Sequence, residues 1–300
     1  MVFLWRLNNA CFLKLLNTVV MKYNKAIVYM IISVIAFAIM NAVVKYVSIF
    51  NAYQIVFFRS IGTLVFTIPL ILRQRIPILG NNKKLLLLRA AAGVISLTLF
   101  FQSLNYLDVG TAVALRYTSP IFAAILALIF LKEKIKTMQW LLFLVAFVGV
   151  LFIKGFSTTI NSLGLLLVIL SALFLGLIFV VIRKMGTKEN PLVIINYFMV
   201  MAFIAGGVMS INHWRNPNTI EWVLLLSLGV FGYIGQLYMT KAFQSQETSL
   251  IAPLKYLEVI FMIIIGATWF GEIYSFWTLF GVFLILLGLV YNVYFKKERP

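Results

Sequence analysis

Long apolar runs separated by short polar stretches fill almost the whole chain. A helix needs about 20 apolar residues to cross the hydrocarbon core of a bilayer. Within each run the hydrophobic residues are continuous rather than alternating, which favours α-helices over the strands of an outer-membrane barrel. The runs that predict membrane-spanning helices are 26–46, 53–72, 85–107, 110–131, 137–153, 162–182, 191–211, 221–243, 248–270 and 274–295.

Composition places the protein in lipid. Hydrophobic residues make up 63% of the 300 residues and charged residues 11%, whereas a soluble domain carries about 25% charged residues. The single cysteine forms no internal disulfide or metal cluster. The sequence has no nucleophile with a histidine base and no phosphate-binding loop, so we expect no catalytic residues, no metal and no cofactor. The expected fold class is an all-α integral membrane protein.

The basic residues predict the orientation. The net charge is +17, and Lys and Arg gather in cytoplasmic loops of membrane proteins, so no nucleic-acid partner is needed to explain it. If the ten spans alternate in direction, the side that holds the N-terminus receives eighteen basic residues and the opposite side receives only Lys45, Lys154 and Arg215. We therefore predict a multi-pass protein of the cell (inner) membrane with both termini in the cytoplasm. The eighteen residues are Arg6, Lys14, Lys22, Lys25, Arg73, Arg75, Lys83, Lys84, Arg89, Lys132, Lys134, Lys136, Arg183, Lys184, Lys188, Lys296, Lys297 and Arg299.

The chain resembles itself at a shift of 139 residues. The segment LRYTSPIF, followed by a Glu, corresponds to LKYLEVIF, which is also followed by a Glu at the same distance. The shift relates the third to fifth spans to the eighth to tenth. Because five spans is an odd number, the second unit is inverted in the membrane, as in many secondary transporters. The identical residues are Leu115 and Leu254, Tyr117 and Tyr256, Ile121 and Ile260, Phe122 and Phe261, Glu133 and Glu272, and Gly149 and Gly288.

These segments also resemble a known family. The stretches TAVALRYTSPIFAAILALIFLKE at 111–133 and SLIAPLKYLEVIFMIIIGATWFGE at 249–272 are similar to the fourth and ninth spans of EamA-type members of the drug/metabolite transporter superfamily. The resemblance covers residues 26–296 and implies ten transmembrane helices in two inverted five-helix repeats. It does not separate substrates, or importers from exporters.

Three segments follow from these patterns. Residues 26–154 form the first five-span repeat and 162–296 the second, inverted repeat. Residues 1–25 are an N-terminal cytoplasmic or interfacial segment. Two interpretations of its beginning remain open: a short helix on the membrane surface, or a true start at Met21.

Charged side chains inside spans are costly and usually face a cavity or a partner. Arg59, Arg116, Lys255 and Glu258 are such residues. We predict that Arg116 and Lys255 line the outer and inner halves of one pathway, each roughly 9 Å inside its span at 1.5 Å per residue. The alternative is that the long basic side chains reach the headgroups. The neutral residues Gln102, Tyr117, Gln236 and Tyr256 complete the predicted pathway.

Acidic residues have three predicted roles. Glu258 follows Lys255 by three residues, which places both on one helix face and favours an ion pair. The alternative for Glu258 is a proton-coupling carboxylate. Glu133 and Glu272, at span ends, are expected to accept hydrogen bonds from neighbouring helix starts.

Pro120 and Pro253 are expected to interrupt their spans.

Together these features predict a secondary transporter that moves a small polar organic solute by alternating access. The excess of basic residues in the spans favours a carboxylate or phosphate on that solute, as in an amino acid or a related metabolite. The alternatives are uptake of S-adenosylmethionine or of a nucleotide-like or vitamin-like solute and, in another class, a channel or a membrane-embedded enzyme. The expected partners are the solute, the lipid bilayer and coupled protons, and the sequence does not indicate an oligomeric state.

Overall fold

The computed structural model describes residues 24–107, 109–154, 161–271, 273 and 275–297, and these residues form helices without any strand. Residues 1–23, which contain Met21 and most of the predicted N-terminal segment, lie outside this part, as do Asp108, Glu272 and Tyr274. The helices before residue 161 are α2 (Asn24–Tyr46), α3 (Ala52–Arg73), α4 (Lys83–Ser103), α5 (Val109–Arg116), α6 (Ser119–Phe130) and α7 (Thr137–Lys154). The later α-helices are α8 (Ser162–Met185), α9 (Pro191–Ser210), α10 (Thr219–Ser245), α11 (Thr248–Ile251), α12 (Leu257–Phe270) and α13 (Phe276–Lys297).

Short 3-10 turns complete the helical elements. These are η1 (Gly186–Lys188), η2 (Ile211–His213) and η3 (Ala252–Tyr256). Seven helical segments of the described residues are long and apolar enough to cross a membrane, and one of them, Thr248–Phe270, combines α11, η3 and α12. The other apolar helices are shorter: Ser119–Phe130, Thr137–Phe152 and Phe276–Asn292.

Asparagine side chains set the starts of five helices. Asn51, Asn82, Asn161, Asn190 and Asn218 each accept a hydrogen bond from a backbone N–H of the first turn. A helix leaves its first N–H groups without intrahelical partners, and Asn is among the residues that satisfy them best. Asn218 and Glu221 form a reciprocal capping box at the start of α10. These caps place each helix start at a defined position in the chain.

The bundle is apolar on its outside and contains polar groups inside. Val65, Ile129 and Val223 are among many large hydrophobic side chains that are exposed, whereas Ser33, Thr63 and other polar residues are buried. This is the reverse of a soluble protein, in which large exposed apolar surfaces are rare. The distribution fits a protein whose outer surface contacts lipid.

Helices cross closely where small residues meet. A Cβ atom on Gly229 of α10 would lie 2.3 Å from the Cα of Gly62 on α3, so only glycine allows this approach. Ser96 of α4 and Ser171 of α8 each donate a hydroxyl hydrogen bond to the other's backbone carbonyl, at 2.8 and 2.7 Å. Small residues and short polar side chains of this kind commonly join helices in membranes.

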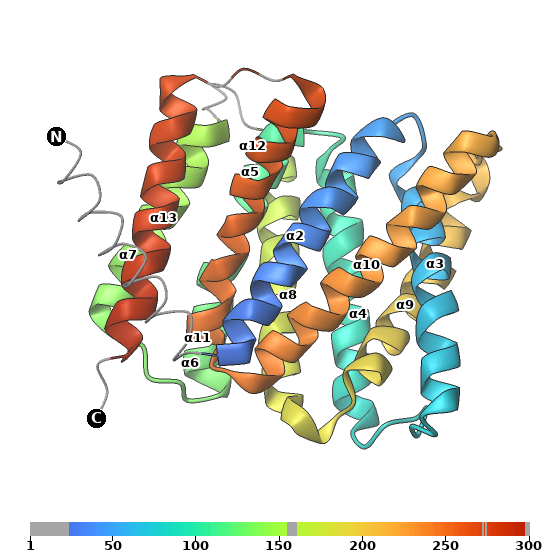
Figure 1. Ribbon diagram of the computed structural model, residues 1–300, viewed down its shortest axis with the longest axis horizontal. Helices are drawn as coiled ribbons and strands as arrows, with labels where there is room; N and C mark the ends of the chain where they lie inside the picture. The colour runs from blue at the N-terminus through green and yellow to red at the C-terminus, as the bar shows by residue number, and fades with distance from the viewer. Residues whose placement is uncertain (1–23, 108, 155–160, 272, 274, 298–300) are drawn as a thin grey trace, which may run out of the picture.

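The helices pack in a regular set of pairs. α7 and α13 pack on each other at one edge of the bundle, and α3 and α9 pack at the opposite edge (Figure 1). Between them, α2 contacts α10 and α12, α8 contacts α4 and α6, and α3 and α4 contact α10 and α9 respectively. The loops 74–82, 131–136 and 186–190 lie at one end, at the bottom of Figure 1. We call this the basic end because these loops carry Arg75, Lys132, Lys134, Lys136 and Lys188.

Candidate solute-binding site

Two broken helices cross the middle of the bundle in opposite directions. α5 is followed by α6 after a break at Tyr117 and Thr118, and α11 is followed by α12 after the 3-10 turn η3. Pro120 and Pro253 lie in the first turns of α6 and η3, and a proline cannot donate the hydrogen bond that would continue the preceding helix. The predicted interruptions are therefore present. The rings of Tyr117 and Tyr256 lie next to the two breaks, with their centroids 6.2 Å apart.

Lys255 and Glu258 form the predicted ion pair beside the second break. The Lys255 ammonium group donates to one oxygen of the Glu258 carboxylate, and the Asn41 side chain on α2 donates to the other oxygen at 2.9 Å. The side chains of Lys255 and Glu258 are 13% and 10% exposed. Burial of a charge is costly without a partner, so the pair and Asn41 stabilise each other.

Arg59 and Arg116 approach the same region from α3 and α5. The centroid of the Phe37 ring on α2 lies 4.6 Å from the Lys255 nitrogen and 5.7 Å from the Arg59 guanidinium carbon. Arg116 lies over the ring of Phe100 at 4.3 Å. The Nε atoms of Arg59 and Arg116 are buried and have no hydrogen-bond partner among the described residues.

Arg89, which we counted among the basic residues on the side that holds the N-terminus, is a further basic residue near this site and lies within a helix instead of a loop. It lies in the second turn of α4 and is 1% exposed. Its Nη2 donates to the side-chain oxygen of Gln236 on α10 at 3.0 Å, and its guanidinium carbon lies 4.2 Å from the ring centroid of Phe198 on α9. Its Nε and Nη1 atoms have no partner in the described part of the chain.

We call these five charged residues, Arg59, Arg89, Arg116, Lys255 and Glu258, the cation cluster. Arg59 lies close enough to Arg89, Arg116 and Glu258 for their charges to interact, and Lys255 is paired with Glu258. The cluster therefore contains four cations and one carboxylate. Within a poorly solvated interior such an excess is unfavourable unless an anion compensates it.

Most of the predicted pathway residues meet at this cluster. Gln236 binds Arg89, and Tyr117 and Tyr256 lie together between the broken helices. The Tyr256 hydroxyl is buried and has no partner among the described residues. Gln102 is exposed in the last turn of α4, and no described side-chain contact joins it to the cluster.

Carboxylates tie the loops at the basic end together. Glu133, which follows α6, accepts hydrogen bonds from the first two N–H groups of α11, at Thr248 (2.8 Å) and Ser249 (3.1 Å), as expected from its position. Its counterpart Glu272 lies outside the described residues. Glu189 likewise accepts from the backbone N–H groups of Asn81 and Asn82 just before α4.

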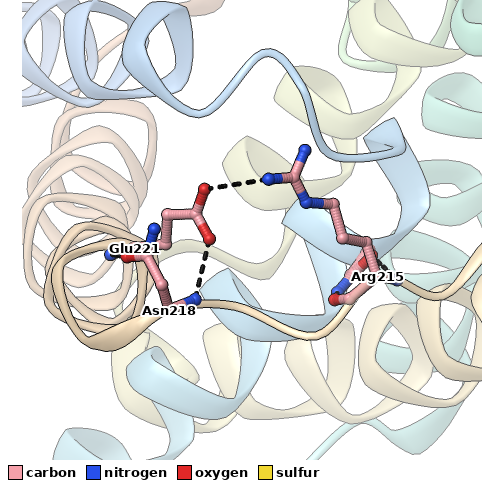
Figure 2. Close-up of polar contacts among 4 residues, drawn as sticks. Arg215, Asn218 and Glu221 are labelled. Carbon is pink, nitrogen blue, oxygen red and sulfur yellow. Dashed lines mark hydrogen bonds and ion pairs between the residues drawn. The ribbon is translucent and has the colours of Figure 1, made fainter.

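The opposite end has a smaller polar network around the start of α10. Figure 2 shows the Glu221 carboxylate between the Arg215 guanidinium at 3.4 Å and the Asn218 backbone N–H at 2.8 Å. The side-chain amide of Gln54 on α3 donates to the Arg215 backbone carbonyl and accepts from its N–H. These contacts join the start of α3 to the loop before α10.

A cavity of about 650 Å³ opens at the basic end, between the loops after α3 and α8 and the last turns of α10. Arg75, Lys188 and Lys241 line it together with Glu189. None of its lining residues belongs to the cation cluster, so the cavity and the cluster are separate features along the bundle.

Comparison with known proteins identifies the family. The model of the EamA-like transporter family matches the chain twice, at residues 24–155 and 162–294, and so covers nearly all of it. The chain belongs to the EamA-like transporter family. Its resemblance to drug/metabolite transporters is therefore confirmed, and it is a multi-pass membrane protein of a family of transporters rather than enzymes.

Individual relatives agree with this assignment. The chain is 31% identical to the pseudopaline exporter CntI of Pseudomonas aeruginosa over 85% of this chain and 90% of that protein. It is 24% identical to an S-adenosylmethionine uptake transporter of Rickettsia bellii over 94% and 98% of the two chains. It is 25% identical to human solute carrier family 35 member G1 over 87% and 77%.

A solved crystal structure of a protein supports the fold. It is 13% identical in sequence and superposes with a TM-score of 0.83 over 92% of this chain and 99% of that chain. At this identity the likeness concerns the fold alone.

Proposed function

We propose that this EamA-like transporter moves a small organic solute carrying a carboxylate or phosphate by alternating access between two inverted five-helix repeats. The observation that carries the proposal is the cation cluster, in which four buried or half-buried cations accompany one carboxylate. The repeats would be residues 26–154 and 162–296. Together they would supply the ten spans expected from the sequence, including the shorter or broken helices.

Helix boundaries support the repeat. A shift of 139 residues moves α2, which starts at Asn24, onto residue 163, next to the start of α8 at Ser162. The same shift moves the start of α3 onto that of α9, the start of α5 onto that of α11, and the start of α7 onto that of α13. The break after Arg116 falls at Lys255 in η3, so both repeats are interrupted at the same place.

Helix contacts support a two-fold relation between the repeats. The shift exchanges the contact of α2 and α10 with that of α8 and α4, and the contact of α2 and α12 with that of α8 and α6. The pairs α3 with α9 and α7 with α13 each map onto themselves. α2 begins at the basic end, whereas α8 finishes there, as expected for inverted units (Figure 1). Two like halves of this kind can rock around a central site.

Chemistry at the cluster favours an acidic solute. Guanidinium groups bind carboxylates and phosphates through paired hydrogen bonds, and three arginines here retain buried nitrogen atoms without a partner among the described residues. Tyr117, Tyr256 and Gln236 would add neutral hydrogen-bonding groups. Gln102 remains a predicted pathway residue whose contribution would depend on a movement of the end of α4.

The relatives differ from one another in their solute and in their direction of transport. One is a pseudopaline exporter and another an S-adenosylmethionine uptake transporter, so membership in the family is compatible with export and with uptake. S-adenosylmethionine carries a sulfonium cation, which the excess of cations disfavours, and it stays as the alternative solute. The bias of basic residues supports cytoplasmic termini in a cell (inner) membrane.

Coupling to protons, if the transporter uses them, would involve Glu258. It is the only acidic residue buried within a helix of the described part of the chain. Its carboxylate accepts hydrogen bonds from the Lys255 ammonium group and the Asn41 side-chain amide. We therefore assign the pair first to neutralising the site, and a proton-carrying role would require the pair to separate during transport.

The test is ligand-dependent thermal stabilisation of the purified protein in detergent. A solute that binds the native state raises the Tm. The panel would contain amino acids, organic acids, nucleotides, vitamins and S-adenosylmethionine. We expect acidic solutes to raise the Tm of the wild type, and Arg116→Gln and Lys255→Gln to reduce the shift strongly.

The matched control is Arg73→Gln, which removes an exposed arginine at the far end of α3, the helix that carries Arg59. It should respond to solutes as the wild type does. Stabilisation by cationic or neutral compounds alone, or normal responses of both cluster variants, would show that the cations are structural and that the proposed class of solute is wrong.

A further inference from the structure

We infer that Arg89, with Gln236 and Phe198, forms a second acid-binding subsite, so that the transported solute carries at least two acidic groups. The inference rests on the proposed function and adds to it the number of acidic groups and the residue that binds the second one. Arg116 would bind the first group from the broken helix α5, and Arg59 would lie between the two subsites.

The contacts of Arg89 leave its charge without compensation. Arg89 is only 1% exposed, yet its one hydrogen-bond partner among the described residues is the neutral side chain of Gln236. The face of Phe198 attracts the guanidinium but carries no net charge. Buried arginines are normally paired with an anion. Two of its nitrogen atoms, Nε and Nη1, remain available to one.

The surrounding residues hold Arg89 in place. A Cβ atom on Gly93, one turn further along α4, would lie 2.6 Å from the Phe198 ring and 3.2 Å from Nη1 of Arg89. Glycine at this position therefore lets the ring and the guanidinium stack beside the helix. A rigidly held cation binds an acidic group at a lower entropic cost than a mobile one.

The rest of the cluster cannot neutralise Arg89. Glu258 already binds Lys255 and Asn41. Arg59 is close enough to repel both Arg89 and Arg116, so it adds to the uncompensated positive charge instead of reducing it. A solute with one acidic group would leave the charge of either Arg89 or Arg116 uncompensated. A solute with two acidic groups would compensate both.

A purely structural role for Arg89 is the competing explanation, since its hydrogen bond joins α4 to α10. The two roles differ in what a substitution changes. In a purely structural role, Arg89 would raise the Tm of the protein without solute and would not discriminate between solutes. As part of a subsite, Arg89 would determine how much the second acidic group of a solute adds to binding.

The experiment compares two probes of nearly equal size, glutarate and its monoamide glutaramate, which differ by one acidic group. Binding to the purified wild type, Arg89→Gln and Arg116→Gln would be measured from the dependence of the Tm on probe concentration. A charge-assisted hydrogen bond gives a preference of about tenfold to a hundredfold. We expect the wild type to prefer glutarate by about tenfold or more, and Arg89→Gln to bind the two probes almost equally.

Two further variants separate binding from folding. Lys84→Gln removes an exposed cation from the first turn of α4 and should keep the wild-type preference. Arg89→Lys retains the charge but not the planar fork, and it should keep an intermediate preference even if Arg89→Gln is unstable. An unchanged preference in both Arg89 variants would overturn the inference while leaving the proposed function in place. If neither probe stabilises any variant, and no other acidic solute does so, the acidic class itself is wrong and the inference falls with it.

Discussion

Glu133 offers the sharpest test of how the basic end is held together. Its two carboxylate oxygens accept hydrogen bonds from different N–H groups, at Thr248 and Ser249, and so fix the start of α11 against the end of α6. The side chain is 6% exposed. In Glu133→Gln the amide nitrogen replaces one of these oxygens, so that one hydrogen bond is lost and two donors face each other.

The size of the effect follows from these contacts. A hydrogen bond to a charged group contributes about 1.5–3 kcal/mol, and a buried N–H left without a partner costs about 1–3 kcal/mol. We therefore expect the free energy of unfolding to fall by about 2–3 kcal/mol. The corresponding decrease in Tm is about 4–12 °C, since 1 kcal/mol shifts the Tm of a larger domain by about 2–4 °C.

Thermal unfolding of the purified protein measures the effect, and Glu221→Gln is the matched control. Glu221 also accepts a hydrogen bond at a helix start, but its side chain is 17% exposed and its cap at Asn218 lies on the surface. Its substitution should lower the Tm by less than half as much, because water satisfies the freed groups. An equal or smaller decrease for Glu133→Gln would show that the carboxylate does not hold α11 in place.

Three further single variants and one double variant test the packing and the charges. Gly229→Ala should lower stability by about 1–3 kcal/mol in thermal unfolding, because its Cβ would meet the backbone of Gly62 and push α3 away from α10; a neutral result would mean that these helices are not in close contact. Glu258→Gln should lower the free energy of unfolding by about 3–5 kcal/mol by leaving Lys255 unpaired. The double variant Lys255→Met with Glu258→Gln should recover part of that loss, and a double variant less stable than Glu258→Gln alone would refute the pairing. Gly93→Ala should weaken glutarate binding without affecting glutaramate as much, since it displaces the ring that holds the second subsite; equal effects on both probes would argue against that arrangement.

The positions of the helices could be predicted well because they depend on local pattern. The apolar runs at 53–72 and 191–211 became α3 (Ala52–Arg73) and α9 (Pro191–Ser210), within two residues at each end. The ion pair of Lys255 and Glu258 could be predicted equally well, because a spacing of three residues in a helix places both side chains on one face. Pro120 and Pro253 marked the positions at which helices break, because proline removes a backbone donor.

Arg89 shows what the pattern could not reveal. It stands six residues after the start of α4 at Lys83, in a stretch with other basic residues, and the count of charges for orientation grouped it with the basic residues of one membrane side. Its burial depends on Gln236 and Phe198, which are more than one hundred residues away in the chain and reach it only through packing of α9 and α10. The sequence did contain one indication that Arg89 is buried: at 1.5 Å per residue, it lies roughly 9 Å from the helix start.

Gln102 is a polar residue whose orientation could not be predicted from the sequence. A polar residue near the end of an apolar run can face the interior or simply mark the end of the span. The structure exposes it in the last turn of α4, and the rotation of a helix end is decided by neighbours rather than by the sequence around it. Its place on the pathway stays a prediction.

The most direct test of the account is transport by the purified protein in proteoliposomes, using the acidic solute that raises the Tm most. Alternating access around one site predicts uptake that saturates with concentration and accelerates when the same solute is present inside the vesicles. Arg116→Gln should lose most of this activity, and Arg73→Gln should retain it. Uptake that rises linearly, ignores solute on the inside or persists in Arg116→Gln would contradict a transporter built around the cation cluster.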